Sequence, residues 1–199
     1  SGKLPKFALE LVHKINEITP VTTSSLICIA LLSKFSLSKI AIENDIIRLM
    51  ELIEKRNPDA LVDRGKPIGE SVQTALNLLI RAKLILQHGD ILHAKYVIIS
   101  ENYLQATYYA NMSVHHLYQR AFIELALLES SEAKPDVRTE IFWSEIMELR
   151  QLFKFEFFYS KKSQFSDELE SNLEVLDKDW GKLIKQTKLG AISFFEKQN

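Results

Sequence analysis

The residues from Leu26 to Leu32 form an unbroken apolar run, and this run constrains the fold more than any other segment. Thr22, Thr23 or Ser24 can cap a helix that begins just before it. A helix that is apolar all round has no polar face to turn to water, so it must be buried by its neighbours. The run is also far shorter than the roughly 18 to 20 residues that cross a bilayer. We therefore expect a buried helix in a mainly α fold.

Composition excludes several classes of function. The chain has 199 residues, 46% of them hydrophobic, which is enough for one large core or two small ones. The 25 Lys and Arg residues are balanced by 26 Asp and Glu residues, so the chain has no excess positive charge to attract nucleic acid or anionic lipid. Binding of either would need a local basic patch. The single cysteine, Cys28, excludes an intrachain disulfide and fits a reducing compartment. We expect its side chain to act as a small buried hydrophobe.

The N-terminal half reads as helices followed by a hairpin. An amphipathic helix over 3–18 ends before Pro20, and the buried helix follows it. Ser36 is the expected cap of a further helix that ends at Asn57-Pro58, and a loop over 58–69 precedes a helix over 70–83. The segments 84–88 and 91–99 then suit two strands joined by a two-residue turn at Gly89-Asp90. This order is typical of a winged helix, so we predict a winged-helix-like unit over 3–100.

The C-terminal half returns to helical periodicity. We expect one long helix from Glu101 to about Ser130, another over 137–155, and one or two more after Ser163, with Phe165, Leu169, Leu173 and Leu176 on one face. These helices form a predicted bundle over 101–199, packed on the first unit as one compact body. Since Ser1-Gly2 resembles a remnant of cloning, we expect the chain to be a C-terminal fragment of a longer protein.

A winged helix invites the hypothesis of DNA binding. The recognition helix would be 70–83, which offers Gln73 and Asn77 to bases. Its cations, Arg81 and Lys83, stand only at its far end, whereas groove binding needs several contacts to phosphates. Nucleic acid is therefore the weaker hypothesis, and a protein-interaction or regulatory module is the alternative for this fold.

The usual chemical motifs are absent from the sequence. No glycine pattern makes a phosphate-cradling loop, and one cysteine with five histidines gives no spaced set of zinc ligands. The histidine pairs, His88 with His93 and His115 with His116, lack spaced carboxylate partners. We predict no metal, no cofactor and no catalytic residue.

Three stretches carry a family resemblance: residues 15–32, 108–115 and 142–159. They resemble the C-terminal region of the bacterial membrane-associated glycerol-3-phosphate 1-O-acyltransferases, and the likeness runs in order from Leu11 to Tyr159. The resemblance implies a parent enzyme of phospholipid biosynthesis that transfers a fatty acyl group from acyl-CoA or acyl carrier protein to the sn-1 hydroxyl of glycerol 3-phosphate. It implies that this piece buttresses an N-terminal acyltransferase domain and seats the enzyme peripherally on the cytoplasmic side of the cell membrane.

The resemblance also shows departures. The family places an Asp five positions after a catalytic His, and here those positions hold Ile18, His93, Ile98, Arg120 and Ala121. The family's Glu-Gly-Gly-x-Arg-Ser segment is absent too, so the fragment itself lacks the catalytic motif. A self-sufficient enzyme with an unfamiliar site stays open as a further hypothesis.

Four residues are candidates for contacts with substrate. Asn111 and His115 match the family's Tyr-Arg-Asn helix, in which Ala110 replaces the Arg; the alternative is a satisfied polar pair buried between helices. Arg150 and Lys154, expected one turn apart, suit a phosphate or lipid headgroup or, alternatively, a solvated face. Aromatic residues beside cations suit a membrane interface or a core: Phe153, Phe155, Phe157, Phe158 and Tyr159 before Lys161-Lys162, and Phe194 and Phe195 before Lys197. We assign Phe153 and Phe157 to the core.

Overall fold

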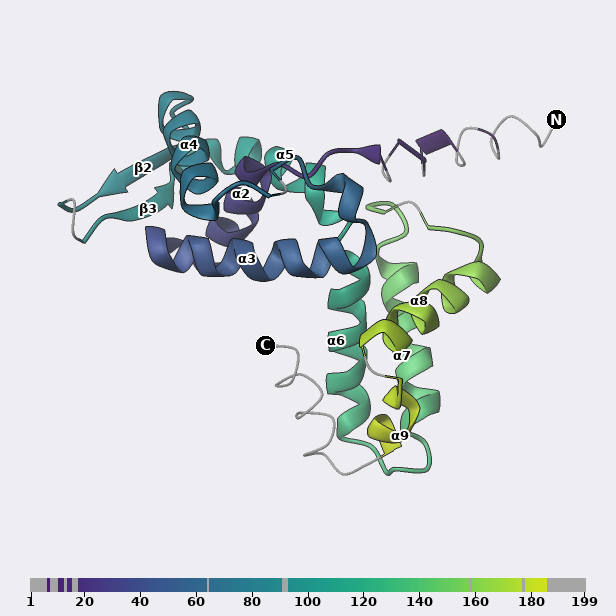
Figure 1. Cartoon of the computed structure of the whole chain (residues 1–199). Helices are drawn as coiled ribbons and strands as arrows, with labels where there is room; N and C mark the ends of the chain where they lie inside the picture. Colours follow the sequence, from purple (N-terminus) through teal and green to yellow (C-terminus); the bar gives the residue numbers. More distant parts are fainter. Residues whose placement is uncertain are drawn as a thin grey trace. The chain divides into compact units, whose positions relative to one another are not determined.

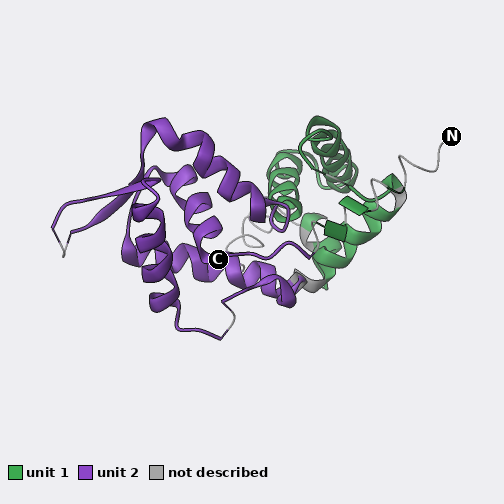
Figure 2. Cartoon of the chain, turned by 90° about the horizontal axis from the view of Figure 1, so that it is seen from above, with its two compact units in different colours: residues 1–15, 118–199 green, residues 16–117 purple. Residues whose placement is uncertain are grey.

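Helices dominate the computed structural model, which describes residues 7, 11–12, 14–15, 18–63, 65–90, 93–157, 159–176 and 178–185. The chain divides into two compact units, shown in Figure 2. Unit 2 is Asn16–Leu117, and unit 1 is Tyr118–Asn199 together with Ser1–Ile15. Each unit has a hydrophobic core of its own. The prediction of a mainly α fold is confirmed.

Figure 1 labels the helices and strands. Unit 2 contains α2 (Thr23–Lys34), β1 (Ser36–Ser38), α3 (Lys39–Arg56), η1 (Pro58–Ala60), α4 (Ile68–Arg81), β2 (Ile85–His88), β3 (Lys95–Ile98), η2 (Ser100–Asn102) and α5 (Tyr103–Val114). Unit 1 contains α6 (Tyr118–Ser131), α7 (Arg138–Leu152), α8 (Lys162–Leu176) and α9 (Trp180–Lys185). The helix expected over 3–18 lies largely outside the described residues, as do Phe158, Phe194 and Phe195.

The apolar run forms α2, which is the central helix of unit 2. The Thr22 hydroxyl caps it by accepting the backbone N–H of Ser25 at 3.2 Å. Leu26, Ile27 and Leu31 are each at most 1% exposed, because α3, α4 and α5 all pack against this helix. The predicted buried helix is confirmed.

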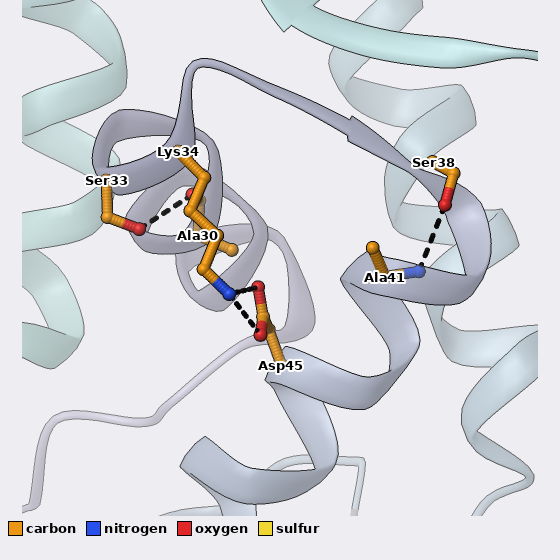
Figure 3. Close-up of polar contacts among 6 residues, drawn as sticks. All are labelled: Ala30, Ser33, Lys34, Ser38, Ala41 and Asp45. Carbon is orange, nitrogen blue, oxygen red and sulfur yellow. Dashed lines mark hydrogen bonds and ion pairs between the residues drawn. The ribbon is translucent and has the colours of Figure 1, made fainter.

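A polar corner turns the chain from α2 into α3 (Figure 3). The Lys34 ammonium lies 2.7 and 2.8 Å from the two carboxylate oxygens of Asp45. The Ser38 hydroxyl accepts the backbone N–H of Ala41 at 3.3 Å and so caps α3. The prediction that Ser36 caps this helix is wrong, because the backbone around Ser36 is extended and pairs with β3 as strand β1.

The sheet is antiparallel and has the strand order β1-β3-β2. The predicted hairpin is present, but the two-residue turn is wrong because His88 pairs with Lys95 and residues 89–94 connect the strands. The Asp90 carboxylate accepts the backbone N–H of His93 at 2.8 Å and closes this longer loop. Gly89 has a φ of 89°, and a Cβ there would lie 2.9 Å from the carbonyl oxygen of His93. The assignment of unit 2 as a winged helix stays a prediction.

The long helix expected from Glu101 to about Ser130 is broken into α5 and α6. Backbone turns close at 3.0 Å from the His116 N–H to the Ser113 oxygen and at 2.9 Å from the Leu117 N–H to the Val114 oxygen. Before the break, α5 packs closely on α2 through small buried residues: Ala106, Ala110 and Ser113. The division between the units therefore follows Leu117, whereas the sequence placed a boundary at residue 100.

Unit 1 is held together by α6 and α7, which pack side by side, and by α8 and α9. Phe142 of α7 and Phe165 of α8 are fully buried in its core. The turn between α6 and α7 is closed by Arg138, whose guanidinium donates to the carbonyl oxygens of Ala133 at 2.9 Å and Ser131 at 3.1 Å. This side chain satisfies carbonyls that the end of a helix leaves without partners.

Two further predictions concern the burial of Cys28 and membrane-spanning helices. Cys28 is buried, and burial raises the pKa of its thiol to about 12, so it behaves as a core residue. Among the described residues, no helix combines the length and the apolar character needed to cross a membrane.

Candidate functional site

The four candidate residues fall in two places. Asn111 and His115 lie at the end of α5 in unit 2. Arg150 lies in the last turn of α7 in unit 1, and Lys154 follows this helix. Each pair is described within its own unit.

At the end of α5, the polar residues divide between surface and interior. Asn111 is exposed, and His115 is half-buried as the C-terminal cap of the helix. They therefore do not form the buried polar pair that the sequence allowed. The buried histidine is instead His116, whose Nε2 lies 3.3 Å from the backbone oxygen of Thr19 and whose ring lies 4.1 Å from that of His115, centroid to centroid.

Ala110, where the resemblance implies an arginine, is packed in the core. Ala110 is 6% exposed, in the core where α5 meets α2. One turn further on, Ser113 and Ser25 bring their hydroxyl oxygens within 2.5 Å across the same contact. Small side chains are what allow two helices to approach this closely, and an arginine at 110 would have to displace its neighbours.

At the end of α7, Arg150 points into an aromatic cluster. Its guanidinium carbon lies 5.0 Å from the ring centroid of Tyr159 and 5.2 Å from that of Phe165. Its Nη2 donates to the carbonyl oxygen of Ser160 at 2.9 Å. The Nε of Arg150 and the hydroxyl of Ser160 are buried without a hydrogen-bond partner among the described residues. Burial, with a smaller contribution from Tyr118, raises the pKa of Tyr159, and the Arg150 charge opposes the rise.

Lys154 lies beyond the end of the helix. The Phe153 N–H caps α7 by bonding the Leu149 oxygen, and the chain then turns. Lys154 is exposed, and its ammonium lies 5.0 Å from the ring centroid of Phe155. The expectation that Arg150 and Lys154 stand one helical turn apart is therefore wrong. Arg150 is directed inward, and Lys154 is at the surface.

The aromatic residues after α7 alternate between the core and the surface. Phe153 and Phe157 are half-buried against the core of unit 1, as expected from the sequence. Phe157 stacks on Tyr118 of α6 with a centroid distance of 4.8 Å. Tyr159 is buried, whereas Phe155 is 87% exposed. The role of Tyr118 as the anchor of this segment was missed, because the sequence placed it in the middle of one long helix.

A groove of about 570 Å³ runs along α7, and its described lining comes from residues 144–152 of that helix. Glu145 and Glu148 are among these lining residues, and none of those described in the groove is a cation. The pKa of Glu145 is raised by burial and by repulsion from Glu148 and Glu129. The groove therefore disfavours a phosphate group.

The described residues also offer no group of three or more histidine, cysteine or carboxylate side chains that could hold a metal ion. His93 does contact a carboxylate, with its Nδ1 3.0 Å from Asp90, but the pair is exposed at the hairpin tip and has no third partner of that kind among the described residues.

Comparison with known proteins decides the family. The model of the glycerol-3-phosphate acyltransferase C-terminal region matches residues 2–194. The chain belongs to this family. It is also 28% identical over 178 residues to proteins named as the acyltransferase plsB1 from Mycobacterium bovis and from two strains of Mycobacterium tuberculosis. The match covers 88% of this chain and 29% of each relative, so the chain spans less than a third of their length. No solved structure matches the chain significantly.

Membership in the family agrees with the motifs on which the resemblance rests. Among the described residues of these stretches, 18–32 form the approach to α2 and most of that helix, 108–115 form the end of α5 with its cap, and 142–157 with Tyr159 form most of α7 and the aromatic segment after it. Each of these stretches contributes to one of the two cores. These three stretches are therefore explained in large part by packing.

Proposed function

We propose that this chain is a non-catalytic C-terminal domain of a glycerol-3-phosphate 1-O-acyltransferase. The enzyme would transfer a fatty acyl group from acyl-CoA or acyl carrier protein to the sn-1 hydroxyl of glycerol 3-phosphate, in phospholipid biosynthesis. The observation that carries the proposal is a family match over nearly the whole chain combined with a sequence in which no histidine is followed five positions later by aspartate. Acyl transfer to a hydroxyl needs a general base, and the family's base is missing here.

The role that fits such a chain is mechanical support. Both units have cores of fully buried aliphatic and aromatic residues, and the helix ends that carry Thr22, Ser38 and Arg138 are closed by specific hydrogen bonds. A well-packed body of this kind can hold a neighbouring domain in a fixed geometry. Its partner would be the acyltransferase domain of the same polypeptide, and the acyl donor would reach the enzyme through that domain.

A second part of the proposal is peripheral seating on the cytoplasmic face of the membrane. No helix among the described residues spans a bilayer, so a contact would be made at the surface. Exposed aromatic and basic side chains are the usual means of such contact, and Phe155 and Lys154 are of this kind.

The non-catalytic assignment is tested by assaying the purified 199-residue chain with glycerol 3-phosphate and each acyl donor. We expect no lysophosphatidic acid above the rate of a reaction without protein. His13→Ala, His115→Ala and His116→Ala variants, each of which removes one candidate base, are assayed in parallel. Turnover by the chain that any of these variants abolished would identify a base of a new kind and would refute the proposal.

DNA binding by unit 2 is the competing proposal. On α4, the Gln73 amide donates to the Asn77 side-chain oxygen at 3.1 Å, so the two base-reading candidates bond to each other. The Arg81 cation stands only at the last turn of this helix. We expect no shift of duplex DNA in a gel at physiological salt, and a shift that weakens steeply with added salt would favour this alternative.

A further inference from the structure

The segment between α7 and α8 places apolar side chains at the surface in an ordered turn. The N–H groups of Glu156 and Phe157 both bond the Phe153 carbonyl oxygen, at 3.0 and 3.1 Å. Phe155 stands at the tip of this turn and is 87% exposed, and Leu152 just before it is 71% exposed. We call the described residues 152–157 and 159–162, which include the last residue of α7 and the first of α8, the α7–α8 loop.

Aromatic contacts hold this loop in place and explain why Phe155 faces outward. Phe157 stacks on Tyr118, and Tyr159 is buried against Phe165 with a centroid distance of 5.3 Å. The Tyr159 hydroxyl also donates to the Phe153 carbonyl oxygen at 3.3 Å. Because the side chains on both sides of Phe155 are fixed to the core, the turn exposes its ring as a consequence of the fold.

The same loop carries positive charge, and one of its cations lies over the exposed ring. The bond from Arg150 to the Ser160 oxygen joins the end of α7 to the residue that precedes Lys161 and Lys162. Both lysines are exposed, as is Lys154, whose ammonium lies over the Phe155 ring. Between residues 152 and 162 the sequence holds three lysines and one acidic residue, Glu156, in a chain whose net charge is −1. The loop thus carries more positive than negative charge in a nearly neutral chain.

We propose that the α7–α8 loop docks on an anionic lipid surface, with Phe155 entering the interface and Lys154, Lys161 and Lys162 contacting lipid phosphates. The proposal rests on the peripheral seating proposed above and gives it a location and a lipid class. Its basis is charge complementarity joined to an exposed aromatic ring. Anionic headgroups meet the lysines, and the acyl boundary beneath the headgroups receives the Phe155 ring.

Neither part of the patch is sufficient alone. One aromatic side chain buries too little area to hold a protein on a neutral bilayer, and three exposed lysines bind anionic lipid only weakly at physiological salt. Together they supply the two signals that surface anchoring requires. Binding should therefore need both anionic lipid and Phe155, and it should weaken as salt is added.

The test is co-sedimentation of the full 199-residue chain with vesicles of phosphatidylcholine alone and of an equal mixture of phosphatidylcholine and phosphatidylglycerol. The loop variants are Phe155→Ser and the double variant Lys161→Gln/Lys162→Gln. Leu104→Ser is the matched apolar control, because Leu104 is also 87% exposed but lies on α5. Lys134→Gln/Lys178→Gln is the matched charge control, because both lysines are exposed elsewhere in unit 1.

We expect the unaltered chain to sediment with the anionic vesicles and to be released at high salt. Phe155→Ser should weaken this binding about tenfold. The double lysine variant should weaken it about twentyfold or more, since each cation near an anionic surface contributes about fivefold. Both controls should bind like the unaltered chain, and thermal unfolding of Phe155→Ser should be unchanged because the ring is exposed.

Two outcomes would overturn the inference. If the unaltered chain ignored anionic vesicles, both the loop and the seating would be rejected. If the chain bound but both loop variants bound equally well, the loop alone would be rejected and the seating would move to another surface. The acyl transfer assay tests the non-catalytic role separately, so a failure of the loop leaves that role unaffected.

Discussion

Replacement of Arg150 by methionine separates a structural role from a ligand-binding role. Methionine keeps an unbranched apolar stem that can pack on the rings but removes the guanidinium and its charge. The variant loses the bond to the Ser160 oxygen at 2.9 Å, and a hydrogen bond from a charged donor is worth about 1.5–3 kcal/mol. It also loses the contacts with the Tyr159 and Phe165 rings, worth about 0.5–1 kcal/mol each.

One term opposes this loss. The Nε of Arg150 is buried without a partner among the described residues, and its removal returns about 1–2 kcal/mol. The net expectation is that Arg150→Met lowers the free energy of unfolding by about 2 kcal/mol. Lys154→Met is the matched control and should change it by less than about 0.5 kcal/mol, since Lys154 is exposed.

The assay is urea unfolding followed by tryptophan fluorescence. Both tryptophans of the chain, Trp143 and Trp180, lie in unit 1 and contact each other with a centroid distance of 6.2 Å, so the signal reports on the unit that contains Arg150. Equal unfolding midpoints for Arg150→Met and Lys154→Met would refute the structural role. Arg150 would then return as a candidate ligand for phosphate.

Three further predictions follow from buried and paired groups. Hydrogen bonds from Lys66 and Thr23 lower the pKa of Asp63, so the stability that this carboxylate contributes is present above its unfolded pKa of about 4 and is lost as pH falls through the lower folded value. In Asp63→Asn, the free energy of unfolding should therefore fall less steeply between neutral and acid pH. An unchanged slope would contradict the role given to Asp63. Phe142→Ala should cost about 3–5 kcal/mol in urea unfolding, because the ring is fully buried, and a loss below about 1 kcal/mol would contradict this packing. Cys28 should react with a thiol reagent only in denaturant, because burial raises its pKa to about 12, and rapid labelling of the folded chain would show that its burial is wrong.

Local patterns predicted the helices well. The run from Leu26 to Leu32 required a buried helix whatever surrounded it, and Asn57-Pro58 ended α3 as expected. The helix break at 115–117 could not be predicted, because no proline or glycine marks it. The break has a tertiary cause. Helix α5 packs on α2 of unit 2, whereas Tyr118, the first residue of α6, packs in the core of unit 1.

The cap of α3 and the hairpin loop show a different limit. Ser36 and Ser38 are chemically alike, and pairing with β3 decided which of them is extended and which caps the helix. Gly89-Asp90 is typical of a two-residue turn, but the Asp90 carboxylate bonds the backbone of His93 and stabilises a longer loop. In both cases a residue of the right type had more than one possible role: pairing with β3 selected the cap of α3, and a local hydrogen bond between Asp90 and His93 selected the longer loop.

The candidate site was predicted less well than the fold. The sequence identified residues 142–159 as unusual and assigned Phe153 and Phe157 to the core, but it left Phe155 and Tyr159 open between a core and a membrane interface. Alternation of Phe153, Phe155 and Phe157 depends on the tight turn at Phe153 and on stacking against Tyr118. Arg150 was grouped with Lys154 by helical spacing, and that spacing ceased to apply where α7 ended.

The central claim is that this chain supports acyl transfer without performing it. It is tested most directly by measuring kcat/KM for glycerol 3-phosphate with the longer enzyme to which we assign the chain, with and without residues 2–194. We predict that the upstream part alone loses most of its activity or unfolds at a lower temperature, and that this chain alone has no activity. Full activity and unchanged thermal stability of the upstream part without this region would contradict the account.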